Sequence, residues 1–352
     1  MSTSTAKRPT VSVAVGTSSS DVSGIGLRRR LLLRGVTVAL IALVAGQAVP
    51  FIADRFLMSL LLDGAILALL ALGIGFLARH LGLISLGHTA FFGGAAYSLA
   101  IAATHWDWGP TPAAVFGFGT GTVLAAGVGV LVVRASGMAF LMLTLALGQA
   151  LYQVCIQTAV RPYTGAFDGL QVEYDMARTF FGLEASEITS AGIFWRVVWV
   201  ALVVSAFGLW LIGRSRFGTV LEGIRENEER MRFSGYATFG PRLIAFIVSG
   251  AVASLGGVLF ALNAGYVSPE TLSFVKAGDS LIAAIVGGIG TLLGPIIGAM
   301  LYIYAQTNFN ASGNLHLYTG IALVLVLALL PGGITGGLTS MYRRFRARLK
   351  GR

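Results

Sequence analysis

The sequence has few charged residues for its length. Only 11% of its 352 residues are Asp, Glu, Lys or Arg, 55% are hydrophobic, and the mean hydropathy is +0.80. A typical soluble domain has about 25% charged residues, which help to cover its surface with groups that water solvates. This shortage argues against a soluble enzyme, a disordered chain and a nucleic-acid-binding domain.

Lysine, cysteine and histidine are also scarce. None of the lysines Lys7, Lys276 and Lys350 follows a glycine, as the phosphate-binding loop of an ATPase requires. The single cysteine, Cys155, excludes an internal disulfide bond and a cysteine-rich metal site. The four histidines are too far apart for the usual spacing of metal ligands. We therefore predict that the chain is not an enzyme and has no catalytic residues, metal site or cofactor of its own.

Long apolar runs are what the sequence has instead. A helix needs about 20 apolar residues to cross a bilayer. The runs are 31–52, 56–78, 83–103, 111–133, 138–160, 193–213, 243–264, 278–307 and 317–330. They predict an all-α polytopic integral membrane protein, with a disordered basic tail over 1–30, a transmembrane domain over 31–335 and a basic cytoplasmic tail over 336–352. A cleaved signal peptide is the alternative for the first run, but the run is long and further spans follow it.

Positive charge predicts the topology and the number of crossings. Lys and Arg gather on the cytoplasmic side of membrane proteins, and both Arg28–Arg30 and the C-terminal segment 343–352 are basic. If both termini are cytoplasmic, the number of crossings is even. We therefore divide 278–307 at Gly287–Gly290 and predict about ten transmembrane segments, some of them short or broken. This topology places 20 of the 25 Lys and Arg residues on the cytoplasmic side.

The divided run is the first candidate for a transport pathway. Short apolar segments interrupted by glycine or proline point to such a pathway, because broken backbone at membrane depth must be enclosed by protein or line a watery cavity. The candidate residues are Gly287, Gly288, Gly290, Gly294 and Pro295. The alternative for each glycine is close helix packing, since Gly290, Gly294 and Gly298 are spaced by four, as are Gly117 and Gly121.

Polar residues in other apolar runs are the second candidate. Ser85, His88 and Thr89 interrupt the run 83–103, and polar groups at this depth usually face the interior of the bundle. We predict that they line the pathway; the alternative is that His88 caps or hydrogen-bonds a neighbouring helix. Asp63 lies in the middle of a run, where an acid is costly unless it is paired or hydrated. Asp279 is expected at the outer start of a helix, where the helix dipole favours a carboxylate.

Two long loops separate the runs. The loop 161–192 is acidic and is expected on the outer side, whereas the loop 214–242 is expected in the cytoplasm. The second loop holds the densest cluster of charges between spans, in which Glu228 and Arg232 are spaced for a helical ion pair. We interpret this loop as a docking surface for a cytoplasmic partner; the alternative is a solvated linker helix.

Several ordered motifs resemble one transporter family. The segments Ser85–Tyr97 and Gly287–Gly298, and the loop Ile224–Glu228 followed by Gly235 and by Leu243–Gly250, are similar to signatures of the LivM-type permease subunits of branched-chain amino acid ABC importers. Weaker matches lie at 143–148 and 164–170, so the resemblance covers roughly 56–335.

The resemblance implies a permease of the bacterial inner (cytoplasmic) membrane and a set of partners. These are a second homologous permease subunit, two cytoplasmic ABC ATPases that bind ATP and Mg²⁺, and an extracytoplasmic solute-binding protein. The loop 214–242 would be the coupling helix that enters an ATPase groove. The coupling residues that we predict are Glu222, Arg225, Glu226, Asn227, Glu228 and Gly235.

The sequence is compatible with three other functions. Related permeases are thought to carry urea or short amides, which is an alternative solute class. An ion-coupled secondary transporter that uses Asp63 is a different mechanism. A scaffold of membrane helices without transport activity is the third possibility.

Overall fold

The structure, a computed structural model, describes residues 20–172, 179–180, 182–184, 191–310, 317, 320–321 and 332–337, and these are almost entirely helical. The longer helices are α1 (Ser20–Ala48), α2 (Arg55–Leu81), α3 (His88–Trp106), α4 (Pro110–Val132), α5 (Gly137–Cys155), α8 (Ala191–Arg214), α11 (Phe239–Ala264), α12 (Phe274–Gly287) and α13 (Gly294–Asn310). Shorter helices are α6 (Arg161–Thr164), α9 (Arg216–Glu226) and α10 (Glu228–Phe233), with 3-10 turns at Val49–Phe51, Thr158–Val160, Ala166–Asp168 and Pro269–Leu272.

Six of the described helices are long and apolar enough to cross a membrane, namely α1, α2, α4, α5, α8 and α11. Helix α3 has 19 residues, whereas α12 and α13 have 14 and 17. The predicted class is therefore confirmed in its main terms: the chain is an all-α polytopic membrane protein. The predicted last run, 317–330, lies mostly outside the described residues.

Helix α2 is the centre of the bundle. Every residue from 64 to 78 is buried, and the helix packs against α8, α11 and α13. Asp54 caps its first turn by accepting a 2.9 Å hydrogen bond from the Leu57 N–H, and Gly82 ends it in a left-handed conformation with φ +67°. Small residues let the neighbours approach: a methyl group added at Gly73 would lie 2.6 Å from the Ser249 carbonyl oxygen.

Glycines also bring α4 against its two neighbours. A methyl group at Gly117 would lie 2.7 Å from the Ala95 carbonyl oxygen of α3, and one at Gly121 would meet both Ala95 and Ser254 of α11. Helix α4 therefore approaches the backbone of α3 at Gly117 and the small side chains of α3 and α11 at Gly121. The packing alternative for Gly117 and Gly121 is confirmed.

The apolar run 278–307 is divided at the place that the sequence predicts. Helix α12 ends at Gly287 and α13 begins at Gly294. The two pack as an antiparallel pair, because Gly298 of α13 faces the Ala283 carbonyl group and Gly287 of α12. At 1.5 Å per residue they span roughly 21 and 26 Å, less than the hydrocarbon core of about 30 Å.

Two predicted boundaries and one predicted position differ from the structure. Helix α1 begins at Ser20, so residues 20–30 of the predicted disordered tail are helical. Helix α3 begins at His88 instead of Leu83, because the chain turns between Gly82 and Gly87 before it can re-enter the bundle. Asp279 lies in the second turn of α12, which begins at Phe274, and not at the helix start.

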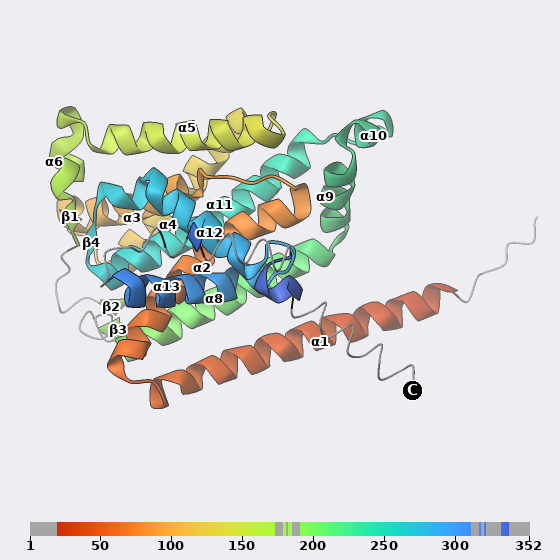
Figure 1. Ribbon diagram of the computed structural model, residues 1–352, viewed down its shortest axis with the longest axis horizontal. Helices are drawn as coiled ribbons and strands as arrows, with labels where there is room; N and C mark the ends of the chain where they lie inside the picture. The colour runs from red at the N-terminus through yellow and green to blue at the C-terminus, as the bar shows by residue number, and fades with distance from the viewer. Residues whose placement is uncertain are drawn as a thin grey trace, which may run out of the picture.

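Helix α1 runs along the edge of the molecule (Figure 1) and is attached through α8. The indole N–H of Trp195 donates a 2.8 Å hydrogen bond to the Gly46 carbonyl group, and that of Trp199 donates a 3.0 Å bond to Ala42. The two rings stack with centroids 5.2 Å apart. Tryptophan can do this because its ring is apolar while its N–H requires an acceptor when buried.

The two ends of the bundle carry different elements (Figure 1). At one end β1 (Leu170–Gln171) pairs antiparallel with β4 (Tyr266–Val267), with Leu170 opposite Val267, and α6 lies beside them. The strands β2 (Thr179–Phe180) and β3 (Leu183–Glu184) pair with each other at the same end. The helices α9 and α10 lie at the opposite end, so the polar loops of the chain are sorted to the two ends of an apolar bundle.

Candidate functional site

The loop between α8 and α11 folds as two short helices joined at one residue. Ser215 caps α9 by accepting a hydrogen bond of 3.3 Å from the Gly218 N–H. Asn227 ends α9 and begins α10, because its extended backbone breaks the helix while its side chain accepts a 2.8 Å bond from the Arg230 N–H. We call residues 215–238 the α9–α10 loop.

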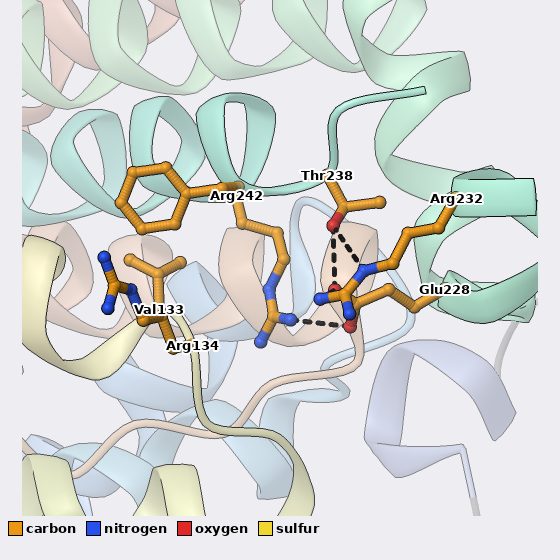
Figure 2. A pocket seen from close by; sticks show the side chains of 7 residues that line it. Val133, Arg134, Glu228, Arg232, Thr238 and Arg242 are labelled. Atoms are coloured by element: carbon orange, nitrogen blue, oxygen red, sulfur yellow. Dashed lines mark hydrogen bonds and ion pairs between the residues drawn. The ribbon is translucent and has the colours of Figure 1, made fainter. Parts of the chain in front are cut away.

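A charged network fixes this loop to α11. One Glu228 oxygen accepts hydrogen bonds from Arg232, 2.7 Å, and from the Thr238 hydroxyl group, 2.9 Å, and the other accepts one from Arg242, 2.6 Å (Figure 2). The Arg242 side chain is only 4% exposed and also donates to the Ala135 carbonyl group in the turn after α4. Arg242 therefore joins α10, α11 and the α4–α5 turn. We call Glu228, Arg232, Thr238 and Arg242 the loop network.

The loop network holds Glu228 in its ionised form. Burial of the carboxyl group opposes ionisation, but the hydrogen bond from Thr238 and the positive charges of Arg242 and Arg232 outweigh it and lower the pKa of Glu228. The network borders a pocket of about 380 Å³ that Val133, Arg134 and Phe239 also line (Figure 2). Arg134 lies over the Phe239 ring at 5.5 Å.

The other predicted coupling residues lie on the same loop but not in the network. Glu222 is 3.8 Å from the Nδ1 atom of His80, and Arg225 donates to the Arg79 carbonyl group, so both hold α9 against the end of α2. Glu226 is exposed, and Gly235 has φ +85°, which allows the chain to turn toward α11. The structure thus brings the six predicted residues onto one loop and places them in different contacts.

Sequence reasoning missed four residues of this region. The spacing of Glu228 and Arg232 indicated their ion pair, but nothing local indicated that Thr238 or Arg242 would join it from outside the helix. Phe233 is 91% exposed, and Tyr236, three positions later, is 54% exposed. An aromatic residue beside a charge cluster in a polar loop is the sequence signal that could have found Phe233 and Tyr236, because aromatic residues are enriched where proteins bind one another.

The predicted pathway residues Ser85, His88 and Thr89 are all buried. The Nε2 atom of His88 lies 3.0 Å from the Ser249 hydroxyl group of α11, and its ring meets the edges of Phe91 and Phe246. Ser85 accepts a hydrogen bond from the Gly87 N–H, and Thr89 donates one to the Leu86 carbonyl group. His88 therefore joins α3 to α11 through its Nε2 atom, while its buried Nδ1 atom has no hydrogen-bond partner in the described part of the chain.

The predicted glycine and proline residues form a second, separate group. Gly288 has φ +110° and lies against Gly332 and Thr335, while Pro295 lies against Gly75 of α2. The Thr335 hydroxyl group donates a 2.7 Å hydrogen bond to the Gly287 carbonyl group and lies 2.7 Å from the Thr291 hydroxyl group. Thr335 therefore satisfies the Gly287 carbonyl group, which the helix break leaves open. Gly287, Gly294 and Gly298 make close contacts, whereas a methyl group at Gly290 would meet no atom within 4 Å.

Comparison with known proteins identifies relatives over most of the chain. Residues 56–330 match the protein family described as "Branched-chain amino acid transport system / permease component". The chain is 27% identical over 336 residues to the high-affinity branched-chain amino acid transport system permease protein LivM of Salmonella typhimurium, covering 89% of this chain and 76% of that protein. It is 26% identical over 297 residues to the inner membrane ABC transporter permease protein YjfF of Escherichia coli, covering 80% and 85%.

A further relative is named for a different solute. The autoinducer 2 import system permease protein LsrC of Escherichia coli is 30% identical over 115 residues, covering 32% of this chain and 33% of that protein. No solved structure matches this chain.

Proposed function

Because this chain belongs to the family of permease components of branched-chain amino acid transport systems, we propose that it imports branched-chain or similar small amino acids across the bacterial inner membrane. In the complete importer it pairs with a second homologous permease subunit, two cytoplasmic ATPases and an extracytoplasmic solute-binding protein. ATP and Mg²⁺ bind in the ATPases. The two relatives named for LivM, which match nearly nine-tenths of this chain, support this solute over autoinducer 2, whose permease matches a third of it.

The α9–α10 loop is the observation that supports coupling to an ATPase. It lies at one end of the bundle (Figure 1), where Phe233 and Glu226 are exposed, while Glu228 and Arg242 fix it to α11. A rigid polar element with an exposed aromatic anchor has the form of a docking surface. Movement of the bound ATPase would reach α11 through Arg242 and α2 through the contact of Arg225 with Arg79.

The topology that we propose has about ten crossings, with both termini and the α9–α10 loop on the cytoplasmic side. The end that carries β1, β4 and α6 is then extracytoplasmic and meets the solute-binding protein. The distribution of Lys and Arg supports this orientation, with 20 of 25 on the cytoplasmic side.

Replacement of the aromatic anchor tests the coupling role. We expect Phe233→Ala to reduce ATPase activity stimulated by the loaded binding protein by about tenfold or more, since a central aromatic contact is worth on the order of 2 kcal/mol. Charge reversal at Arg225 and Glu226 should have the same effect. The measurement is ATP hydrolysis by the purified complex of two permease subunits and two ATPases in nanodiscs, with loaded binding protein added.

A matched variant makes this test specific. Phe51, 80% exposed, ends the 3-10 turn Val49–Phe51 between α1 and α2, which the proposed topology places outside the cytoplasm, so Phe51→Ala removes a similar ring that faces no ATPase. It should leave stimulated hydrolysis within twofold of the wild type. Equal hydrolysis in the wild type and Phe233→Ala, with the complex intact, would refute docking through this loop.

The solute is tested on the whole importer. Leucine, isoleucine and valine should bind the partner binding protein and be taken up by proteoliposomes only when the ATPases and ATP are present. Uptake of urea or a short amide in their place would assign the alternative solute class. Uptake of autoinducer 2 would assign the solute of the LsrC relative.

An ion-coupled secondary transporter is the second candidate, because Asp63 is an exposed acid within a membrane-spanning helix. In that mechanism the chain alone transports, and Asp63→Asn abolishes transport that needs no ATPase. Uptake that stops when the ATPases are omitted excludes it.

A further inference from the structure

Charged and polar side chains of four helices gather near the outer end of the bundle. The Asn263 amide group donates a 3.2 Å hydrogen bond to the Asp63 carboxylate. The Lys276 ammonium group interacts electrostatically with the carboxylates of both Asp63 and Asp279. The members are Asp63 of α2, Asn263 of α11, Lys276 and Asp279 of α12, and Tyr302 of α13. We call these five residues the outer cluster.

The groups of the outer cluster are near one another but do not close into ion pairs. Among the described residues, no pair within 4.0 Å joins Lys276 to either carboxylate. The Tyr302 side chain is 7% exposed, and its hydroxyl group lies beside Asp279 without a hydrogen-bond partner at normal distance in the described part of the chain. If the cluster only stabilised the fold, its opposite charges would be expected in direct contact, because unpaired buried charges are costly.

The position of Asp63 indicates what it faces. It lies eight residues after Arg55, about 12 Å along α2, yet its side chain is exposed, as is Ser59 one turn earlier. From Gly64 to Ala78 the helix is continuously buried. A carboxylate at this depth does not face lipid but water or another protein subunit. The outer cluster therefore opens onto an aqueous path or onto the second permease.

We propose that the outer cluster binds the charged ends of a zwitterionic α-amino acid on its way through the membrane. The Lys276 ammonium group receives the solute carboxylate, and Asp63 and Asp279 receive the solute ammonium group. The inference rests on the proposed function and names the part of the permease that recognises the solute.

The other features of the outer cluster also suit a bound amino acid. Lys276 is the third residue of α12, whose first backbone N–H groups carry partial positive charge that favours a carboxylate at the same place. The Tyr302 hydroxyl group and the Asn263 amide group provide further polar contacts without net charge. A neutral solute, in contrast, has no charged end to offer to Lys276 or to the two carboxylates.

The experiment measures transport and ATP hydrolysis together in the complete importer, with leucine as the probe. Proteoliposomes receive leucine-loaded binding protein and ATP, and the ratio of leucine transported to ATP hydrolysed is determined. For Lys276→Met and Asp63→Asn we expect this ratio to fall by about tenfold or more, the effect of losing a hydrogen bond to a charged group. Stimulated hydrolysis should persist because the α9–α10 loop is unchanged.

Two control variants separate recognition from structure. Lys276→Arg keeps the positive charge and should retain most of the ratio. Glu270→Gln removes an exposed acid in η4 (Pro269–Leu272), the turn before α12, and should leave the ratio unchanged. A common decrease of transport and hydrolysis in Lys276→Met and Asp63→Asn would identify the outer cluster as a structural lock and overturn the proposal, as would an unchanged ratio.

The wild-type importer distinguishes this inference from the proposed function. If it does not transport leucine, the proposed function fails by itself, and the ratio is then measured with the solute that the binding protein carries. A neutral solute transported with an intact ratio in Lys276→Met would overturn the outer cluster as a zwitterion site.

Discussion

Arg242 is a buried cation whose charge must be balanced by its hydrogen-bond partners. Its side chain is 4% exposed, and its acceptors are Glu228 and the Ala135 carbonyl group. Removal of one member of a buried ion pair leaves the other charge uncompensated, which costs about 3–5 kcal/mol in well-buried cases. Glu228 is partly exposed, with 24% of its side chain accessible, so the cost here is at or below the lower end of that range.

Glu228→Gln should therefore destabilise the subunit by on the order of 2–3 kcal/mol. The amide group can still accept from Arg242 but brings no charge to balance it. The measurement is thermal unfolding of the purified subunit in detergent, with the loss visible as a lower Tm. Glu229→Gln, an exposed acid one residue later, is the control and should leave Tm unchanged.

The Tm difference between the wild type and Glu228→Gln should depend on pH because the pKa of Glu228 is lowered in the folded state. A carboxyl group whose pKa is lower in the folded state stabilises the fold above its unfolded pKa, and the contribution disappears as the pH falls through the folded value. The Tm difference between wild type and Glu228→Gln should be full at pH 7 and shrink below about pH 4.5. A difference that stays constant down to pH 3 would contradict the ionised network.

At the scale of single residues, local spacing predicted only local partners. Glu228 and Arg232 are one helical turn apart, and their contact could be read from the sequence. Arg242 meets the same carboxylate from the start of the next long helix, a contact that depends on how the loop returns to α11. His88 was recognisable as a polar residue inside the bundle, but its contact with Ser249, 161 positions away, depends on the packing of α3 against α11.

At the scale of elements, the break between α12 and α13 was predictable from the length and the glycine content of its apolar run. Gly287, Gly288, Gly290 and Gly294 interrupt a run too long for one crossing and too short for two. The close pairing of the two halves was not predictable to the residue, since it depends on which glycine faces which carbonyl group. The structure assigns that role to Gly298, and not to Gly290.

Substitution of Gly298 and of Gly290 by alanine tests which glycine the packing of α12 against α13 requires. A methyl group at Gly298 would overlap the Ala283 carbonyl oxygen and Gly287, so Gly298→Ala should force α12 and α13 apart and lower stability by roughly 1–3 kcal/mol, as overpacking does. Gly290→Ala meets no neighbouring atom and should leave stability within about 0.5 kcal/mol. Thermal unfolding in detergent measures both. Equal Tm values for the two variants would contradict the close pairing of α12 and α13.

At the scale of the whole molecule, apolar runs predicted the order and approximate bounds of most long helices, because hydrocarbon imposes a length that the sequence must meet. The sequence did not indicate that α2 would be central and α1 peripheral, although both are apolar. Their difference lies in residues such as Gly64, Gly73 and Gly75, which admit neighbours to α2, and in Trp195 and Trp199, which hold α1 from one side.

The number of crossings joins these scales, because the α12–α13 break decides on which side the chain ends. If α12 and α13 are two crossings, the positive charges of 343–352 lie on the same side as the α9–α10 loop. If they form one crossing, the tail lies opposite that loop, where the positive-inside rule disfavours it. Single cysteines can distinguish the two arrangements in a Cys155→Ala background, which removes the one native thiol.

We expect a membrane-impermeant maleimide to label Phe167→Cys in intact cells, because Phe167 is 72% exposed beside β1 at the proposed outer end. Ser234→Cys in the α9–α10 loop and Lys350→Cys in the tail should react only in inverted membrane vesicles. Labelling of position 350 together with position 167 would give an odd number of crossings and remove the proposed topology. Labelling of 350 together with 234 would leave an even number, with α12 and α13 as separate crossings, and would place the half-helix that carries Lys276 with its start toward the outside.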